Sequence, residues 1–365
     1  MSDEIRRLLF TGEPYSDESF IGYLLRLTEL NNFNRLTWIL EFSGLKASLT
    51  TKTLPGITSN NNLKILAKLI GIDEKVLKPL TYKVNDDIPN KPKPRYLLFG
   101  KSLPSFLIIQ TISRLCPVCL TEQYYLRQIW EFAPITVCLI HRCLLIDFCP
   151  KCGKRLIWNR SAVSKCFCGF DFRSAKPSFV SEKELRISQH LYELCGIAES
   201  DNDLKLGEYL NDLDLVYFIR FVFFFASFWA GIGETSGKGL IYHSSNLDLH
   251  KCLNFVAVIF DDFSRNFYVF LDWIRYQNIL YFGDKVRAAG HYLREDNEQG
   301  VIEWFRISLT NEFDSPQFDF LHEAFKKYAK SAPKDFGPRN FFYTTPEVLK
   351  EVFAQLIKSK KLADN

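Results

Sequence analysis

Four short cysteine and histidine motifs decide the fold in the middle of this chain. They are CPVC at 116–119, CLIH at 138–141, CPKC at 149–152 and CFC at 166–168. A Cys-x-x-Cys turn directs two thiolates at one point, and a tetrahedral zinc ion needs a second such pair from elsewhere in the chain. The motifs therefore predict two structural zinc ions. The expected ligands are Cys116, Cys119, Cys138 and His141 at the first site, and Cys149, Cys152, Cys166 and Cys168 at the second.

Other roles fit these cysteines less well. Disulfides need an oxidising compartment, and the charged first residues do not resemble a secretory signal. At the first site Cys143 could replace His141, but we favour His141 because Cys-x-x-His repeats the spacing of its partner pair. Four protein ligands leave no open position for a catalytic water, so we expect a protein that is not an enzyme.

Helical patterns precede the cysteines. Residues 16–30 predict an amphipathic helix capped by Ser16 or Asp17, and a second helix is expected from 34 to 42. The stretch LKILAKLIGIDEKVLKPL (63–80) has the apolar spacing of a helix-turn-helix, with Gly71 in the turn and Asp73 as the second cap. Its recognition helix would be 74–82, although Pro79 lies inside it. A helical hairpin that serves only packing is the alternative.

The complete pattern predicts a mainly α fold with small zinc-ribbon-like modules. We expect an N-terminal helix-turn-helix-like domain (1–95), a tandem zinc-binding module (96–180) and a helical, aromatic-rich domain (181–365). Helices are expected in the last domain at 185–195, 208–230, 252–283, 301–310, 317–330 and from Thr345 to about Lys361. The most apolar stretch, 215–230, is shorter than the roughly 20 residues of a spanning helix and contains Arg220, so no membrane contact is expected.

Charge is unevenly distributed along the chain. The net charge is +4, but residues 101–180 hold 11 Lys and Arg against 4 acids, while 181–365 hold 21 against 27. A basic middle and an acidic end suggest contact with a polyanion on one part of the molecule only. A solvated surface is the alternative. The candidate nucleic-acid or partner contacts are Arg114, Arg127, Arg142, Lys151, Lys154, Arg155, Arg160 and Lys165.

Two segments together resemble the TniQ family. The first is PYSDESFIGYLLRLTELNNFN (14–34), with its acidic start, its aromatic-Leu-x-Arg-Leu helix and its final Asn. The second is CPVCL followed by Trp130 and then by VCLIHRCLLIDFCPKCG (137–153). The resemblance covers roughly residues 10–170. The closing CFC departs from the pattern because it is Cys-x-Cys where Cys-x-x-Cys is expected.

The resemblance implies a cytoplasmic bacterial protein that selects targets for a transposon, without catalysing a reaction. Such an adaptor recognises attachment-site DNA, or a guide-RNA effector complex in a CRISPR-associated transposon, and recruits an AAA+ ATPase regulator that brings in the transposase. Docking on an RNA-guided complex and direct DNA binding both remain open. So does a zinc-stabilised helix-turn-helix DNA-binding regulator unrelated to transposition. We expect the acidic, aromatic end to mediate homodimerisation or docking on the target complex.

Overall fold

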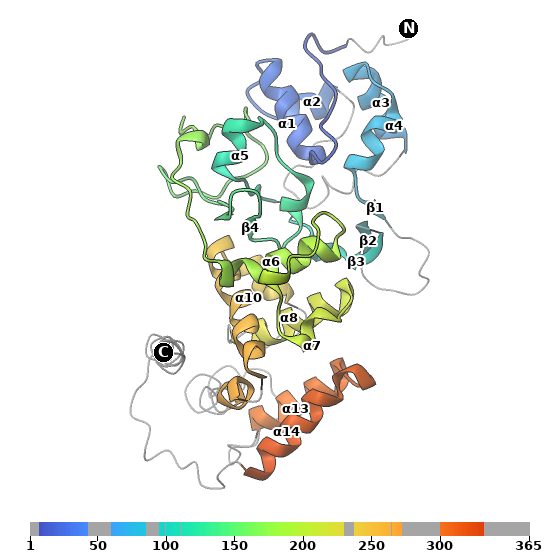
Figure 1. Cartoon of the computed structure of the whole chain (residues 1–365). Coiled ribbons are helices and arrows are strands. Elements are labelled where there is room, and N and C mark those ends of the chain that lie inside the picture. The colour runs from blue at the N-terminus through green and yellow to red at the C-terminus, as the bar shows by residue number, and fades with distance from the viewer. Residues whose placement is uncertain are drawn as a thin grey trace. The chain divides into compact units, whose positions relative to one another are not determined.

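The computed structural model describes residues 7–42, 60–84, 95–98, 100–109, 111–229, 237–263, 265–271 and 300–331 (Figure 1). The chain divides into two compact units, Met1–Phe267 and Tyr268–Asn365. The described part is mainly helical, with one three-stranded and one two-stranded antiparallel sheet, as the sequence predicts. The three-domain division, with boundaries after 95 and 180, stays a prediction.

The first helix begins later than expected. It is α1 (Phe20–Leu30), and its N-cap is Ser19, whose hydroxyl accepts a hydrogen bond of 2.9 Å from Gly22 N. The prediction of Ser16 or Asp17 as the cap is therefore wrong. Glu18 is fully buried and paired with Arg26 at 2.6 Å, which fixes the preceding turn outside the helix. The next helix, α2 (Thr37–Phe42), also starts later than the predicted residue 34.

The helix-turn-helix candidate is only partly formed. Its helices are α3 (Asn60–Ile70) and α4 (Glu74–Leu77), followed by the 3-10 turn η1 (Lys78–Leu80). Gly71 adopts φ 83°, and the Asp73 carboxylate accepts from Lys75 N at 2.8 Å, so the predicted turn and cap are confirmed. The continuous helix expected over 74–82 does not form, because Pro79 has no backbone N–H to donate the hydrogen bond that would extend α4.

Short strands and turns make up the middle of the first unit. The three-stranded sheet has the order β1-β2-β3, with β1 Lys83–Val84, β2 Arg95–Leu98 and β3 Lys101–Pro104. The hairpin consists of β4 (Val137–Cys138) and β5 (Cys143–Leu144). The short helical elements are η2 (Ser105–Leu107), α5 (Pro117–Glu122), η3 (Gln128–Glu131) and η4 (Phe172–Ser174).

Helices complete the first unit. They are α6 (Glu182–Leu194), η5 (Asn202–Leu204), α7 (Glu208–Asn211), α8 (Leu215–Trp229), α9 (Lys238–His243) and α10 (Asn246–Asp261). The helix expected over 208–230 is broken, because Asp214 accepts from Val216 N at 2.8 Å and starts α8. Phenylalanines fill the interface between α8 and α10, where the ring centroids of Phe221 and Phe260 lie 4.9 Å apart. None of the helices in the described part of the chain has the length and apolar character that crossing a bilayer requires.

The second unit has an aromatic core of its own. Its described elements are α13 (Gly300–Glu312), η6 (Pro316–Phe318) and α14 (Asp319–Ser331). Phe305 of α13 packs against Phe325 of α14, with ring centroids 6.1 Å apart. The helix predicted from Thr345 and the end of the one predicted over 252–283 lie outside the described residues.

Polar contacts fasten the N-terminal helices to the cysteine-rich segment, which we define as residues 111–180. Tyr125 donates to Asp17 at 2.6 Å, and Tyr124 donates to Glu29 at 2.6 Å. Farther along, the hydroxyl of Tyr82 donates to the buried carboxyl of Glu131 at 2.7 Å. These bonds join residues about 50 to 110 positions apart, so they hold the fold together in three dimensions.

Replacing Glu131 with glutamine should flatten the pH dependence of stability. Burial raises the pKa of Glu131 to about 7, so the folded protein favours the protonated carboxyl. This contribution to the free energy of unfolding is complete below the unfolded pKa of about 4.3 and is lost as the pH rises to and through 7. The loss amounts to at most about 4 kcal/mol. Glu131→Gln stays neutral and should be more stable than the parent at pH 8. Urea unfolding between pH 5 and 8 measures the difference, with exposed Glu182→Gln as control. Parallel stability curves for parent and variant would contradict the assignment.

Candidate metal centres

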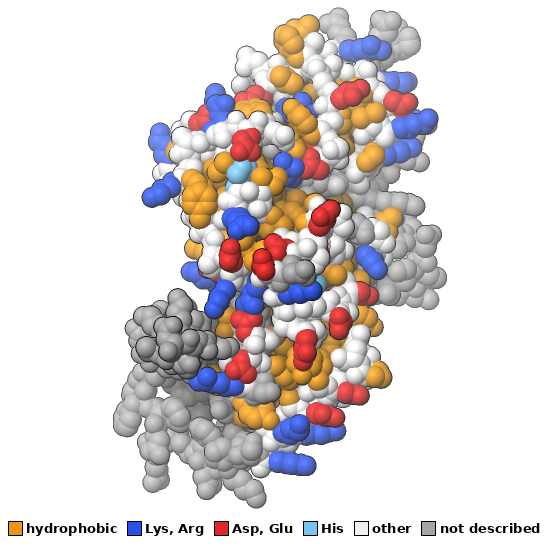
Figure 2. All heavy atoms as spheres, viewed as in Figure 1, with side chains coloured by type: hydrophobic (Ala, Val, Ile, Leu, Met, Phe, Trp, Pro, Cys, Tyr) orange, Lys and Arg blue, Asp and Glu red, His pale blue; other side chains and the backbone are white. Residues whose placement is uncertain are grey.

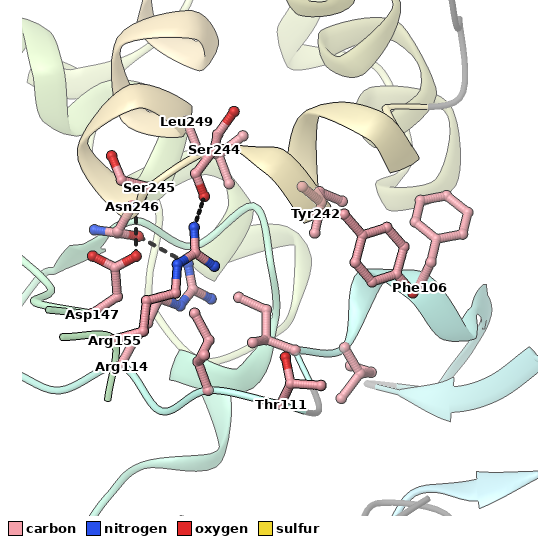
Figure 3. Close-up of a pocket in the computed structure, with 14 residues that line it drawn as sticks. Phe106, Thr111, Arg114, Asp147, Arg155, Tyr242, Ser244, Ser245, Asn246 and Leu249 are labelled. Atoms are coloured by element: carbon pink, nitrogen blue, oxygen red, sulfur yellow. Dashed lines mark hydrogen bonds between the residues drawn. The ribbon is translucent and has the colours of Figure 1, made fainter. Parts of the chain in front are cut away.

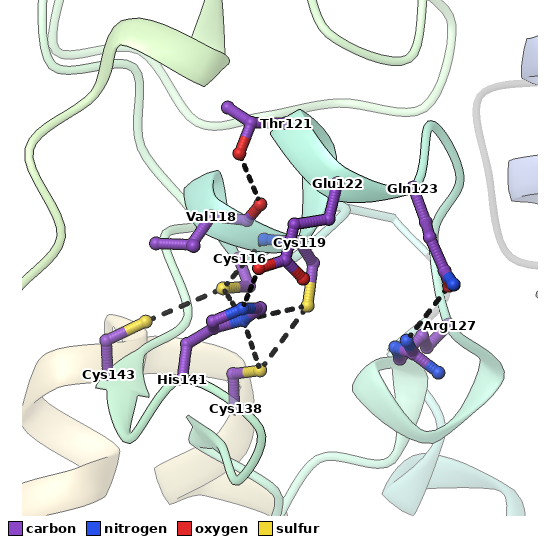
Figure 4. Close-up of polar contacts among 10 residues, drawn as sticks. All are labelled: Cys116, Val118, Cys119, Thr121, Glu122, Gln123, Arg127, Cys138, His141 and Cys143. Carbon is purple, nitrogen blue, oxygen red and sulfur yellow. Dashed lines mark hydrogen bonds and ion pairs between the residues drawn. The ribbon is translucent and has the colours of Figure 1, made fainter.

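Four side chains converge beside α5 and the β4–β5 hairpin (Figure 4). The Nδ1 atom of His141 lies 3.5, 3.2 and 3.7 Å from the sulfurs of Cys116, Cys119 and Cys138. The Cys119 and Cys138 sulfurs are 3.6 Å apart. With metal–ligand bonds of 2.0–2.3 Å, a tetrahedral site has edges of roughly 3.5–3.8 Å. The four ligand atoms therefore already have the spacing that one ion requires.

Local structure explains this convergence. Cys116 is the N-cap of α5 and Cys119 lies in its first turn, where its backbone N–H donates to the Cys116 sulfur at 3.4 Å. Cys138 ends β4, and His141 lies in the turn that leads to β5. Arg142 closes this turn with φ 47°, a conformation rare for residues other than glycine. A helix start and a hairpin thus each contribute one pair of ligands.

Cys143 lies beside the first cluster but outside its group of four ligand atoms. Its sulfur is 3.5 Å from that of Cys116. The group whose ligand atoms all lie within 4.8 Å of one another nevertheless contains His141 and not Cys143. The geometry thus agrees with the preference for Cys-x-x-His.

Glu122 holds the imidazole in place, a role that the sequence analysis missed. Its Oε1 lies 2.9 Å from Nε2 of His141, the ring nitrogen that does not contact the sulfurs (Figure 4). An N–H at Nε2 that donates to Glu122 leaves the Nδ1 lone pair free to bind an ion. The available signal was the position of Glu122, three residues after Cys119 on the helix that carries two ligands.

The second cluster is built from two knuckle-like turns. The sulfurs of Cys149 and Cys168 are 3.6 Å apart and those of Cys152 and Cys166 are 3.8 Å apart. All four lie within 4.8 Å of one another, so the Cys-x-Cys pair serves as well as Cys-x-x-Cys. Each turn ends in a left-handed glycine, Gly153 at φ 67° and Gly169 at φ 80°. The residue after each cysteine pair thus has a positive φ, a backbone conformation that glycine adopts without strain.

Two thiols have a lowered pKa. Hydrogen bonds from Cys119 and Cys138 hold the pKa of the Cys116 thiol well below its usual range. At the second cluster, a hydrogen bond from the Phe170 backbone lowers the pKa of Cys168 to about 7. Since thiolates are the form that binds metal ions, each cluster offers one ligand that is readily deprotonated near neutral pH.

Two of the predicted basic contacts lie inside the protein. Arg114 is 3% exposed and Arg160 is 2% exposed. Arg160 donates to the carbonyls of Ala162 and Ile157 at 2.9 Å and to the hydroxyl of Ser113 at 2.6 Å. Arg114 is bound by carbonyls in a similar way. Both guanidinium groups therefore stabilise the fold, and we exclude them from any contact surface.

The other basic residues differ in how available they are. Arg127 pairs with Asp17, Arg142 pairs with Glu182 at 3.5 Å, and Arg155 donates to Ser244 O at 2.9 Å. The three exposed lysines, Lys151, Lys154 and Lys165, all lie on the loops of the second cluster. Figure 2 shows Lys and Arg side chains along the edge of the molecule that these loops form.

The described fold and its two cysteine clusters define a mainly helical protein with two centres that could each hold a metal ion. The family model described as TniQ matches residues 9–145, so the resemblance is confirmed over that range. The match spans the N-terminal helices and all four residues of the first cluster, and ends before the second. No curated protein matches the chain.

Proposed function

We propose that this chain is a non-catalytic target-selection adaptor of a bacterial transposition system, with two structural zinc ions. The observation that supports the proposal is the TniQ match, which covers the N-terminal helices and the first cluster in one continuous range. The donor sets support zinc: three thiolates with one imidazole, and four thiolates. Such sets, with no open position, are typical of structural zinc.

The proposed partners are an AAA+ ATPase regulator and either a guide-RNA effector complex or target DNA. The buried face of α1 cannot make the ATPase contact, because Phe20, Tyr23 and Leu24 are at most 2% exposed. The tip of the first cluster is better suited, since Ile140 between its ligands is 60% exposed. An exposed apolar side chain on a rigid turn is a suitable anchor for a protein partner.

The truncated α4 favours protein docking over direct reading of DNA. A recognition helix must extend far enough into the major groove to place several side chains on base edges. Here the helix has four residues before Pro79 interrupts it. Three exposed lysines on the second cluster give only a small electrostatic contribution to nucleic-acid binding. We therefore favour a guide-RNA effector complex as the target.

The test compares the complete chain with residues 1–267. A cut at residue 180 is unsuitable, since it removes Leu185, which packs on Val137, and Asn246, which binds Arg114. Both proteins should contain two zinc ions per chain by elemental analysis and should bind the ATPase in a pull-down. Only the complete chain should dimerise in light scattering and dock on the target complex. A 1–267 protein that still does both would contradict the role given to the C-terminal unit. A native protein with one zinc or none would contradict the metal assignment.

A further inference from the structure

A cavity of about 100 Å³ opens in the first unit (Figure 3). Its walls come from residues 106–109 with 111–114, from Asp147 with Arg155, and from residues 241–249. Most of the wall is apolar. The apolar side chains are Phe106, Ile108, Ile109, Ile112, Ile241 and Leu249. None of the eight candidate metal ligands contributes to it.

Arg155 brings a positive charge to this cavity. Its Nη2 group donates to Ser244 O at 2.9 Å, and its guanidinium lies 5.1 Å above the ring of Phe148. These two contacts fix the direction of the side chain. Among the residues that the structure describes, its Nε and Nη1 groups have no hydrogen-bond acceptor. Arg155 therefore holds N–H donors ready for a group that enters the cavity.

The charges around the cavity leave a positive excess. Arg114 and Arg155 are cationic, and Asp147 is the only acid that lines the wall. Arg114 is bound by the carbonyls of Trp130, Phe132 and Ala133 and by Asn246. One oxygen of Asp147 accepts from Asn246 N at 3.0 Å. An entering carboxylate would therefore meet Arg155 and would balance the excess charge.

The size and walls of the cavity narrow the choice of ligand. A cavity of roughly 150 Å³ holds one benzene molecule, so this one admits a single side chain and not a nucleotide. A phosphodiester would gain little from the isoleucine walls. We infer that the cavity binds the glutamate side chain of a protein partner, whose methylene groups pack on the isoleucines while its carboxylate accepts from Arg155. This inference depends neither on the metal ions nor on the proposed role in transposition.

The probe is N-acetyl-glutamate N-methylamide, with the glutamine analogue as its neutral match. Binding to the complete chain is measured by saturation-transfer NMR. The glutamate probe should bind with a millimolar dissociation constant, and the glutamine probe about ten-fold or more weakly, because a charge-assisted hydrogen bond is lost. Arg155→Met should weaken glutamate binding by a similar factor. Lys154→Met, at the exposed neighbouring residue, should leave it unchanged.

Metal content and circular dichroism establish whether Arg155→Met folds. If it does not, Thr111→Trp at the exposed rim provides the second test, since it should block the glutamate probe without removing a charge. Equal affinity for the two probes would overturn the inference, as would equal losses in Lys154→Met and Arg155→Met. Inorganic phosphate that displaces the glutamate probe at equal concentration would also overturn it, by indicating a nucleic-acid partner.

Discussion

Arg114→Met should destabilise the first unit by about 3–5 kcal/mol, enough to unfold many domains. The guanidinium is 3% exposed and is bound on every side. It donates to Trp130 O at 2.6 and 3.0 Å, to Phe132 O at 2.6 Å and to Ala133 O at 3.0 Å. Methionine would fill most of the volume but would leave the carbonyls of Trp130 and Ala133 buried without this donor, at a cost of about 1–3 kcal/mol for each. The carbonyl of Phe132 would keep its hydrogen bond of 3.0 Å from Ile135 N.

The loss extends to α10. Arg114 also donates to Oδ1 of Asn246 at 3.0 Å, while the Asn246 amide donates to the carbonyls of Thr136 and Leu145 at 2.8 and 2.7 Å. Asn246 is the first residue of α10, so this network fastens the helix to the cysteine-rich segment. In a double-mutant cycle, the losses of stability caused by Arg114→Met and Asn246→Ala should therefore not be additive, as is expected for two residues in direct contact.

Urea unfolding measures the effect, with exposed Lys154→Met as the matched control. Arg114→Lys should not rescue stability, because one ammonium group cannot reproduce the planar fork that reaches four acceptors. If Arg114→Met were as stable as Lys154→Met, the arginine would not have the structural role given to it here.

The sequence predicted those features that depend on short spacing. The spacing of cysteine pairs, two or three residues apart, is enough to predict a set of metal ligands. In the same way, Gly71 and Asp73 are enough to predict a turn and a helix cap. The cap of α1 could not be chosen among Ser16, Asp17 and Ser19 by type alone. It was decided by the burial of Glu18 against Arg26, a contact between side chains eight residues apart.

Charge counts could not separate buried from exposed arginines. Arg114 and Arg160 contribute to the basic middle of the chain. Arg114, however, donates to carbonyls 16 and 19 residues away, and Arg160 donates to a hydroxyl 47 residues away, and only the folded chain brings these groups together. The same limit applies to Glu122, whose partner His141 is 19 residues away, and to the cavity beside Arg155, which is formed by three separate segments. Side-chain contacts between residues far apart in the chain are the part of the site that cannot be predicted from a single sequence.

The two metal centres should differ sharply in what they contribute to stability. At the first, Cys116, Cys119 and Cys138 are at most 3% exposed. They join α5 to a hairpin whose Val137 packs on Leu185 of α6. At the second, Cys149 is buried but Cys168 is exposed. Losing the first ion therefore separates elements in the core of the unit, whereas losing the second loosens loops at its edge.

Cys138→Ser should abolish the cooperative unfolding of the first unit, because binding of a structural zinc ion contributes roughly 10 kcal/mol or more to folding. Cys168→Ser should also lose one ion per chain, but it should keep a cooperative transition at a lower temperature and gain protease cleavage near residues 165–171. Glu122→Gln should lie between the parent and Cys138→Ser, with binding at the first site weakened about 10- to 100-fold. Elemental analysis, calorimetry and limited proteolysis of the three variants measure these differences. Because both cysteine variants lose one thiolate, a larger loss of stability in Cys168→Ser would reverse the ranking of the two centres and would place the main support of the fold in the exposed loops.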